Sequence, residues 1–375
     1  MDRVRRFEFV GGTSAKFWEI GRAGAAVTVR FGRLGTDGQT QTKDLGSDAE
    51  ASDHVARLIK EKLAKGYIEV TGREPAAGGI DFSQGVTRPP VLPPYEVPSV
   101  PADGPVKVGE ILLPAGRRLE GDPDMAPPGI EMITAPVVWL TNTPVADAGA
   151  LLYRLRAPSS QIGLVPVLLE GMESEPSRPW DSKEFSPTDP RRTDHFDAAQ
   201  ALEEMWSRSV DPEDEESLVP VRPFGLEFPG LAAPPAVGAP SGFKGLFSRP
   251  ADPDDDRAAL ARLTSRRIGL VAAKRPADTI TALGWMGAAN VHDDPTLISA
   301  VLRSWEDRWA ARLVAIEFAT LTLTVGNPPR DRETAVALAA EHYALCPDNI
   351  LQGSGSLEAY AKGLVGSRTW MFWWD

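Results

Sequence analysis

Residues 16–33 read KFWEIGRAGAAVTVRFGR, and this stretch determines how the first part of the chain folds. In VTVRF (27–31), apolar and polar residues alternate, which is the pattern of a half-buried β-strand. KFWEI (16–20) predicts a second short strand just before it. Two such strands so close in sequence favour an antiparallel sheet.

The residues around this stretch complete a small α+β module. Ser47 is placed to cap a helix, and Glu50 three residues later completes a capping box. Apolar residues then recur at helical spacing until Gly66, which favours the end of a helix. Further strands are expected at residues 5–10, 39–45 and 67–70. The sequence therefore predicts a small antiparallel sheet with one helix packed on it.

These motifs together resemble a WGR domain. The resemblance rests on KFWEI (16–20), VTVRFGRLGTDGQTQTK (27–43) and a capped helix ending in EKLAKGYIEV (61–70), and it covers about residues 3–71. The tripeptide that gives the family its name falls at Phe31-Gly32-Arg33, where Phe replaces the Trp. In poly(ADP-ribose) polymerases, similar domains contact DNA near a strand end and relay that contact to neighbouring domains. The resemblance thus implies a binding module.

The tripeptide also suggests how a ligand would be bound. Phe31 offers a flat ring to a base or ribose, and Gly32 lets the backbone approach closely. Arg30 and Arg33 would form charge-assisted bonds to phosphate. Lys16 and Lys43 would add positive potential.

A structural interpretation of the same residues remains open. Phe31 is in register with Val27 and Val29, so it would belong to the core, and Arg33 would close a turn against Asp37. An arginine next to an aromatic residue often serves structure or a protein partner.

The chain is predicted to have two folded parts joined by a tether. Residues 73–105 hold eight prolines, which exclude a helix or a central strand. We therefore expect a module over 1–71, a semi-extended linker over 72–105 and a larger domain over 106–375. Within that domain, residues 229–258 are expected to form a mobile loop, and 262–375 the best-patterned core.

The larger domain is predicted to be an α/β sandwich with a mixed sheet. PVVWLT (136–141), IGLVPVLL (162–169) and IGLVAAK (268–274) have the apolar character of buried strands. The last 110 residues predict the order β-α-β-β-α-β, with helices on one face of the sheet. In the strand at 320–325, Thr alternates with Leu and Val, so one face is expected to be wet.

The larger domain resembles the bacterial domain-of-unknown-function family numbered 4253. The resemblance rests on GWMGAANVHDD (284–294), VLRSWEDRWAARLVAIEF (301–318) and the terminal WMFWWD (370–375), with further similarity in VVWLTNTPVADAGALLYRL (137–155). It covers about residues 105–375. It implies no activity, because the family has none established.

Three groups in the larger domain have chemical potential. His342 and Cys346 lie four residues apart on a predicted helix, as in a thiol nucleophile, but the negative end of the helix dipole disfavours a thiolate there. His292-Asp293-Asp294 would suit a hard cation, although Asp294 before Pro295 also reads as a helix N-cap. Trp373 points away from Trp370 and would contact a partner if exposed.

Composition restricts the function further. Residues 1–72 carry 12 Lys and Arg against 10 Asp and Glu, whereas the whole chain has a net charge of −12. Nucleic acid needs a positive field, so only this first segment is a candidate for binding it. One cysteine excludes an intrachain disulfide, and no apolar h-region precedes the first strand, so we expect a cytoplasmic protein. No motif indicates a cofactor, a metal or a catalytic fingerprint.

The sequence therefore favours a non-enzymatic interaction or adaptor protein whose first module docks a protein partner or a neighbouring domain. The alternative is binding of nucleic-acid ends by that module, in defence or repair. An enzyme with a site near His342 and Cys346 is a third hypothesis. No membrane partner is expected.

Overall fold

The computed structural model describes ten stretches of the chain: residues 4–11, 14–33, 39–44, 46–64, 67–70, 95–125, 130–210, 218–235, 253–292 and 294–374. The chain divides into two compact units, residues 1–90 and 91–375. Each unit has its own sheet and its own hydrophobic core.

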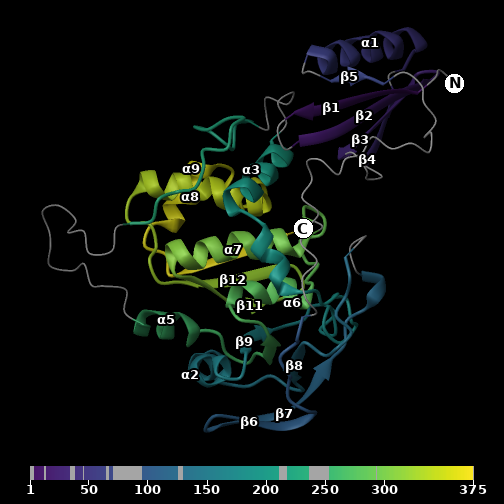
Figure 1. Cartoon of the computed structure of the whole chain (residues 1–375). Helices are drawn as coiled ribbons and strands as arrows, with labels where there is room; N and C mark the ends of the chain where they lie inside the picture. Colours follow the sequence, from purple (N-terminus) through teal and green to yellow (C-terminus); the bar gives the residue numbers. More distant parts are fainter. Residues whose placement is uncertain are drawn as a thin grey trace, which may run out of the picture. The chain divides into compact units, whose positions relative to one another are not determined.

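The small unit is an antiparallel sheet with one helix, as predicted (Figure 1). Its strands lie in the order β4-β3-β2-β1-β5. Their bounds are Arg5–Gly11 (β1), Ser14–Ala23 (β2), Ala26–Arg33 (β3), Gln39–Asp44 (β4) and Ile68–Glu69 (β5). The helix α1 spans Asp48–Ala64.

Alternation along the strands sorts the side chains of the small sheet onto two faces. Phe7, Trp18, Ile20 and Val27 are buried and form one core with Ala51 and Ile59 of α1. The ring of Trp18 lies 5.4 Å from that of Phe7 in this core. The helix therefore covers one face of the sheet and leaves the other free of helix within the described residues.

The large unit is built on an eight-stranded mixed sheet in the order β13-β12-β11-β9-β10-β8-β7-β6. β11 is parallel to β9, and the other neighbouring strands are antiparallel. The bounds are Gly104–Val108 (β6), Ile111–Leu119 (β7), Val138–Thr141 (β8), Leu164–Leu169 (β9), Ile268–Ala272 (β10), Ala311–Ile316 (β11), Thr320–Val325 (β12) and Thr369–Trp373 (β13). The two alike stretches of sequence, β9 and β10, are interior neighbours.

Helices cover both faces of the large sheet (Figure 1): those of the last 110 residues lie on one face, as expected, and helices from earlier in the chain cover the other. Every residue of β9 and β10 is buried, which requires cover on both sides. The helices are α2 (Ala148–Ser160) and α5 (Pro253–Leu260) on one side, and α3 (Ala198–Ser209), α6 (Thr279–Leu283), α7 (Pro295–Trp309), α8 (Arg332–Leu345) and α9 (Leu357–Leu364) on the other.

Three segments differ from their predicted states. The hairpin β6–β7 was not predicted. Residues 95–103, assigned to the tether, contribute Val97 and Val100 to the large core. The ends of the predicted mobile loop 229–258 are ordered, with Ala232 buried near one end and α5 at the other.

The face of β12 that was expected to meet solvent does so only in part: Thr320 and Thr322 are half-buried, whereas Thr324 is buried. Alternation alone could not distinguish an interior strand from one that borders solvent.

Candidate functional site

The helix-free face of the small sheet is defined here by Arg6 and Glu8 on β1, Phe17 and Glu19 on β2, and Thr28 and Arg30 on β3. Each of these residues alternates with a core residue of its strand, so all six share the face opposite α1. Arg30 is one of the predicted binding residues, whereas the sequence analysis did not single out Phe17 or Arg6.

An aromatic ring lies between two guanidinium groups on this face. The guanidinium carbons of Arg6 and Arg30 are 4.7 and 5.1 Å from the centre of the Phe17 ring. Phe17 is only 1% exposed although it faces away from the helix. The two arginines therefore stack on Phe17 and help to bury it, with a cation–π attraction of about 0.5–2 kcal/mol each.

Two carboxylates neutralise these arginines. Glu19 accepts two bonds from Arg30, at 2.8 and 3.1 Å, and one from Arg6 at 2.8 Å. Glu8 accepts from Arg6 at 2.8 Å. The bonds from Arg30 and then Arg6 lower the pKa of Glu19 despite its partial burial. The described charged side chains of this face thus sum to zero.

Exposed apolar side chains border the charged set. Ile68 on β5 lies directly opposite Glu8, which places it on the same face, and it is 72% exposed. Val70 follows by alternation, and its backbone amide donates to the carbonyl of Arg6. Val4, two residues before Arg6, is also exposed. An apolar border beside a lattice of Arg and Glu is the composition of a docking surface.

The structure places the backbone of the name-giving tripeptide in β3. Phe31 pairs with Trp18, Gly32 with Phe17 and Arg33 with Lys16. Lys43 pairs with Val27. The side chains of Phe31, Arg33, Lys16 and Lys43 lie outside the described part of the structure, as does Asp37. Arg30 is therefore the predicted residue of this module whose side chain is seen, and it is held by Glu19.

Cys346 and His342 lie in the core of the large unit. Burial raises the pKa of the Cys346 thiol to about 12, and its Sγ donates to the backbone oxygen of Trp373 at 3.0 Å. His342 is fully buried among aromatic rings, and this burial lowers its pKa well below its ordinary value. A neutral buried thiol beside a neutral imidazole is a poor nucleophile pair.

Cys346 and Asn349 help to close an edge of the sheet. In β13, the backbone groups that face away from β12 are bonded by side chains. Asn349 donates to the oxygen of Met371 at 2.7 Å and accepts from the amide of Trp373 at 3.3 Å. Cys346 bonds the oxygen of Trp373, whose side chain is half-buried. The side chains thereby occupy groups that would otherwise pair with another strand.

The acidic stretch near residue 293 acts as a helix cap. Asp294 accepts from the backbone amide of Thr296 at 2.9 Å at the start of α7. His292 is buried, and its Nε2 lies 2.6 Å from the backbone oxygen of Leu345. Asp293 lies outside the described residues. Among the residues that are described, no three His, Cys, Asp or Glu side chains gather as metal ligands would.

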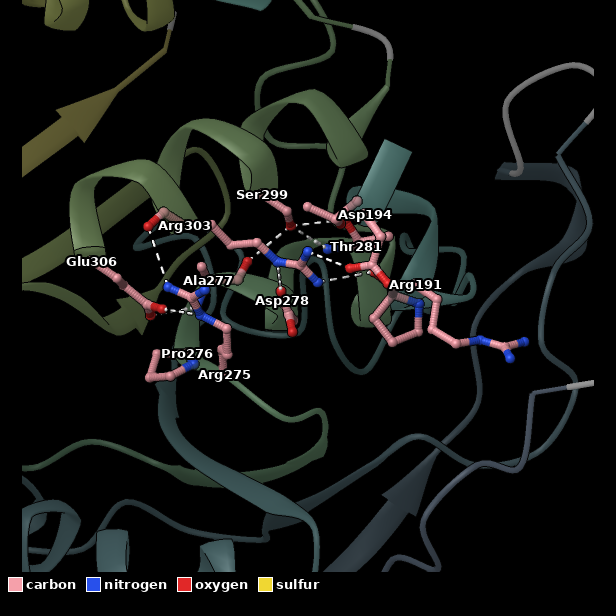
Figure 2. Close-up of polar contacts among 12 residues, drawn as sticks. Arg191, Asp194, Arg275, Pro276, Ala277, Asp278, Thr281, Ser299, Arg303 and Glu306 are labelled. Atoms are coloured by element: carbon pink, nitrogen blue, oxygen red, sulfur yellow. Dashed lines mark hydrogen bonds and ion pairs between the residues drawn. The ribbon is translucent and has the colours of Figure 1, made fainter. Parts of the chain in front are cut away.

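A polar cluster that the sequence analysis missed joins α6 and α7 to the 3₁₀ helices at Pro190–His195 and Pro276–Asp278 (Figure 2). Arg303 and Arg275 each bind two carboxylates, at 2.5–2.8 Å. These are Asp278 and Asp194 for Arg303, and Glu306 and Asp307 for Arg275. Burial raises the pKa of Asp278 and of Glu306, against the bonds from their arginines. Each arginine is paired with two carboxylates, so the described cluster has no unpaired arginine to offer a ligand. Its ion pairs join α7 to the residues that follow β10.

Comparison with known families agrees with the two-part organisation. Residues 1–74 match the WGR domain, and residues 267–375 match a domain of unknown function, DUF4253. The chain carries a WGR domain and a DUF4253 domain. The DUF4253 resemblance was expected over about residues 105–375. The family model matches only the C-terminal part of that region, residues 267–375. WGR domains are nucleic-acid-binding or adaptor modules.

Similar proteins share only a short stretch with this chain. The uncharacterized protein YfeS of Escherichia coli is 34% identical over 65 residues, which are 17% of this chain and 27% of YfeS. Protein YehF of the same organism is 35% identical over 66 residues, or 18% and 24%. The chain thus covers about a quarter of these relatives. A crystal structure of a Bacteroides fragilis protein shows 47% identity over 18% of this chain and 19% of that one, with a TM-score of 0.18.

Within the described ranges, no helix has both the length and the apolar character to cross a bilayer.

Proposed function

We propose that this is a non-enzymatic, cytoplasmic interaction protein whose WGR domain docks a protein partner through the helix-free face of its sheet. The observation that carries the proposal is the neutral set of Arg6, Glu8, Glu19 and Arg30 around Phe17. A face with matched donors and acceptors suits the mixed charges of a protein surface. A polyanion would instead have to displace Glu19 and Glu8 from the arginines.

The apolar border supports a protein partner as well. Val4, Ile68 and Val70 would be buried by a partner that covers the β1–β5 edge of this face. Burial of a Val or Ile side chain contributes about 1.5–3 kcal/mol, whereas exposed ion pairs contribute little net affinity. We therefore assign most of the affinity to the apolar border and specificity to the charged set, where a reversed charge would be repelled by the partner.

Photo-crosslinking from inside the domain tests this proposal. A photoreactive residue is placed at Thr28, on the helix-free face, or at Arg57, on the exposed side of α1, in the full chain within its native cells. The expected result is one stoichiometric protein adduct from position 28 and none from position 57. Equal adducts from both positions, or none from either, would contradict the proposal.

Binding of nucleic-acid ends is the second candidate function. Two observations favour it: Arg30 is half-exposed over an aromatic ring, and the first 72 residues have the only positive charge balance in the chain. The residues involved would be Phe31, Gly32, Arg33, Arg30, Lys16 and Lys43.

Removal of one carboxylate tests this second candidate. Glu19→Gln would release Arg6 and Arg30, raise affinity for nicked duplex severalfold at low salt, and steepen the salt dependence by about one charge. Glu69→Gln, which releases Arg5 on the other face, is the matched control. No binding of either variant at low salt would dismiss this candidate.

A further inference from the structure

The segment Phe228–Pro235, FPGLAAPP, crosses the large unit without regular secondary structure. At its centre, backbone atoms of Ala232 form hydrogen bonds with two side chains. The backbone amide of Ala232 donates to Oε1 of Glu341 at 2.7 Å, and the backbone oxygen of Ala232 accepts from Nη1 of Arg308 at 2.8 Å. One ion pair therefore binds both backbone polar groups of a single residue, much as a neighbouring strand would.

The ion pair that binds the segment is formed by Glu341 and Arg308, and Glu341 is hydrogen-bonded on all sides. Glu341 on α8 is fully buried, accepts two bonds from Arg308 on α7, and accepts a third from Nε1 of Trp305 at 2.8 Å. A buried charge is costly unless its bonds are satisfied. Of the bonds to Glu341, the one from Ala232 comes from outside α7 and α8.

Both ends of the segment are also bound. The ring of Phe228 lies 5.9 Å from that of Trp206 on α3, which in turn meets Tyr343 at 5.3 Å. The side-chain amide of Asn327 donates to the backbone oxygen of Pro235 at 3.3 Å. An aromatic contact, an ion pair and an amide thus bind successive points of the segment, whose backbone turns at Gly230, where φ is 86°.

The segment and the residues that bind it belong to the same compact unit, 91–375, but they differ in how the family model covers them. Trp305, Arg308, Asn327 and Glu341 lie inside the DUF4253 match, 267–375, whereas residues 228–235 lie outside it. Recognition depends on the main chain, a small side chain at position 232 and one aromatic ring. Ala233, the next residue, is exposed.

We propose that Trp206, Arg308, Asn327 and Glu341 form a peptide site, occupied by the chain's own FPGLAAPP segment, and that an Ala- and Pro-rich segment of a partner protein takes its place. Such a ligand has little conformational entropy to lose, because prolines already favour an extended backbone. The own segment acts as an intramolecular competitor at millimolar effective concentration, so the partner binds when that segment is released. This site is independent of the WGR domain and of its proposed partner.

A labelled FPGLAAPP peptide and the full chain test the proposal. Ala232→Pro removes the amide that Glu341 binds and leaves the four side chains of the site unchanged, so this variant should bind the peptide at least tenfold more tightly than the wild-type chain. Ala233→Pro, at the exposed neighbour, is the matched control and should bind like the wild type. A peptide with Pro at the position of Ala232 should bind at least tenfold more weakly.

Two results would overturn the proposal: failure of the folded variant to bind the peptide, and a dimer that depends on the segment. If the Ala232→Pro chain has wild-type tryptophan fluorescence and does not bind millimolar peptide, the segment is only part of the fold. If that variant does not fold, Phe228→Ala, which removes only the aromatic contact, must show the same gain in peptide affinity. A wild-type dimer by light scattering that dissociates in Ala232→Pro would identify a second copy as the occupant and contradict a partner.

Discussion

Substitution of Glu341 is the sharpest test of the core of the large unit. Glu341→Ala would remove the acceptor of two bonds from Arg308, one from Trp305 and one from Ala232. The Arg308 charge would lose its buried partner, and two buried N–H groups would lose their acceptor. Breaking a buried pair in this way costs about 3–5 kcal/mol, a large part of the stability of a typical domain.

Two other variants provide comparisons for the loss of unfolding free energy expected in Glu341→Ala. Glu341→Gln retains an oxygen of similar shape, so we expect a smaller loss, about 1–3 kcal/mol. Glu358→Ala breaks an exposed pair in which Glu358 and Arg332 are each more than half exposed, and should change stability by less than about 1 kcal/mol. The order of the three free energies follows from the burial of Glu341 and from the oxygen that Gln retains there.

Urea unfolding followed by tryptophan fluorescence measures these free energies. Nine of the ten tryptophans follow residue 90, so the signal reports chiefly on the large unit. The account predicts that Glu341→Ala shifts the midpoint far more than Glu358→Ala at an unchanged slope. Equal midpoints for these two variants would refute the assignment of Glu341 as a buried, fully bonded charge.

Three further predictions concern other residues. Burial raises the pKa of Cys346 from 9.0 to about 12, so the neutral thiol contributes stability that is present below pH 9 and lost as pH rises through 12; Cys346→Ala should lose stability less steeply over that range in urea titrations. Asn349→Ala should speed hydrogen exchange at the amide of Trp373, with no change at the interior strand β10, and equal protection in the variant would count against edge closure. Phe17→Ala should destabilise the small unit by about 3–5 kcal/mol, and Phe17→Leu by clearly less, whereas a tolerated Phe17→Ala would show that the ring is not packed.

Much of the fold was predictable because it depends on local patterns. Alternation at 27–31 and the helical spacing that follows Ser47 predicted the small unit, and both the strand β3 and the helix α1 are present. In the large unit, the apolar runs at 162–169 and 268–274 predicted interior strands, and Asp294 before Pro295 predicted the start of α7. Each of these signals lies within a few residues of the element it predicts.

The missed features depend on contacts between distant residues. Glu341 is surrounded by apolar residues in sequence, but its burial follows from Arg308 and Trp305 on another helix. The hairpin β6–β7 was missed because prolines near its start suggested a continuing linker. Helices on both faces of the sheet could not be predicted from element order alone.

For the candidate interface, one local signal was present but unused. Phe17 is out of phase with Trp18 and Ile20, so an aromatic residue on the polar face was visible in the sequence. Its two arginine neighbours come from different strands, and their pairing with Glu19 depends on strand register.

Charge reversal with the purified partner, once it is identified by crosslinking from position 28, tests the central claim most directly. We expect Arg30→Glu to raise the dissociation constant at least tenfold. Arg57→Glu, an equal change of charge on α1, should leave the dissociation constant within twofold of the wild-type value. Equal effects of the two variants would show that the partner responds to net charge and does not dock on the helix-free face.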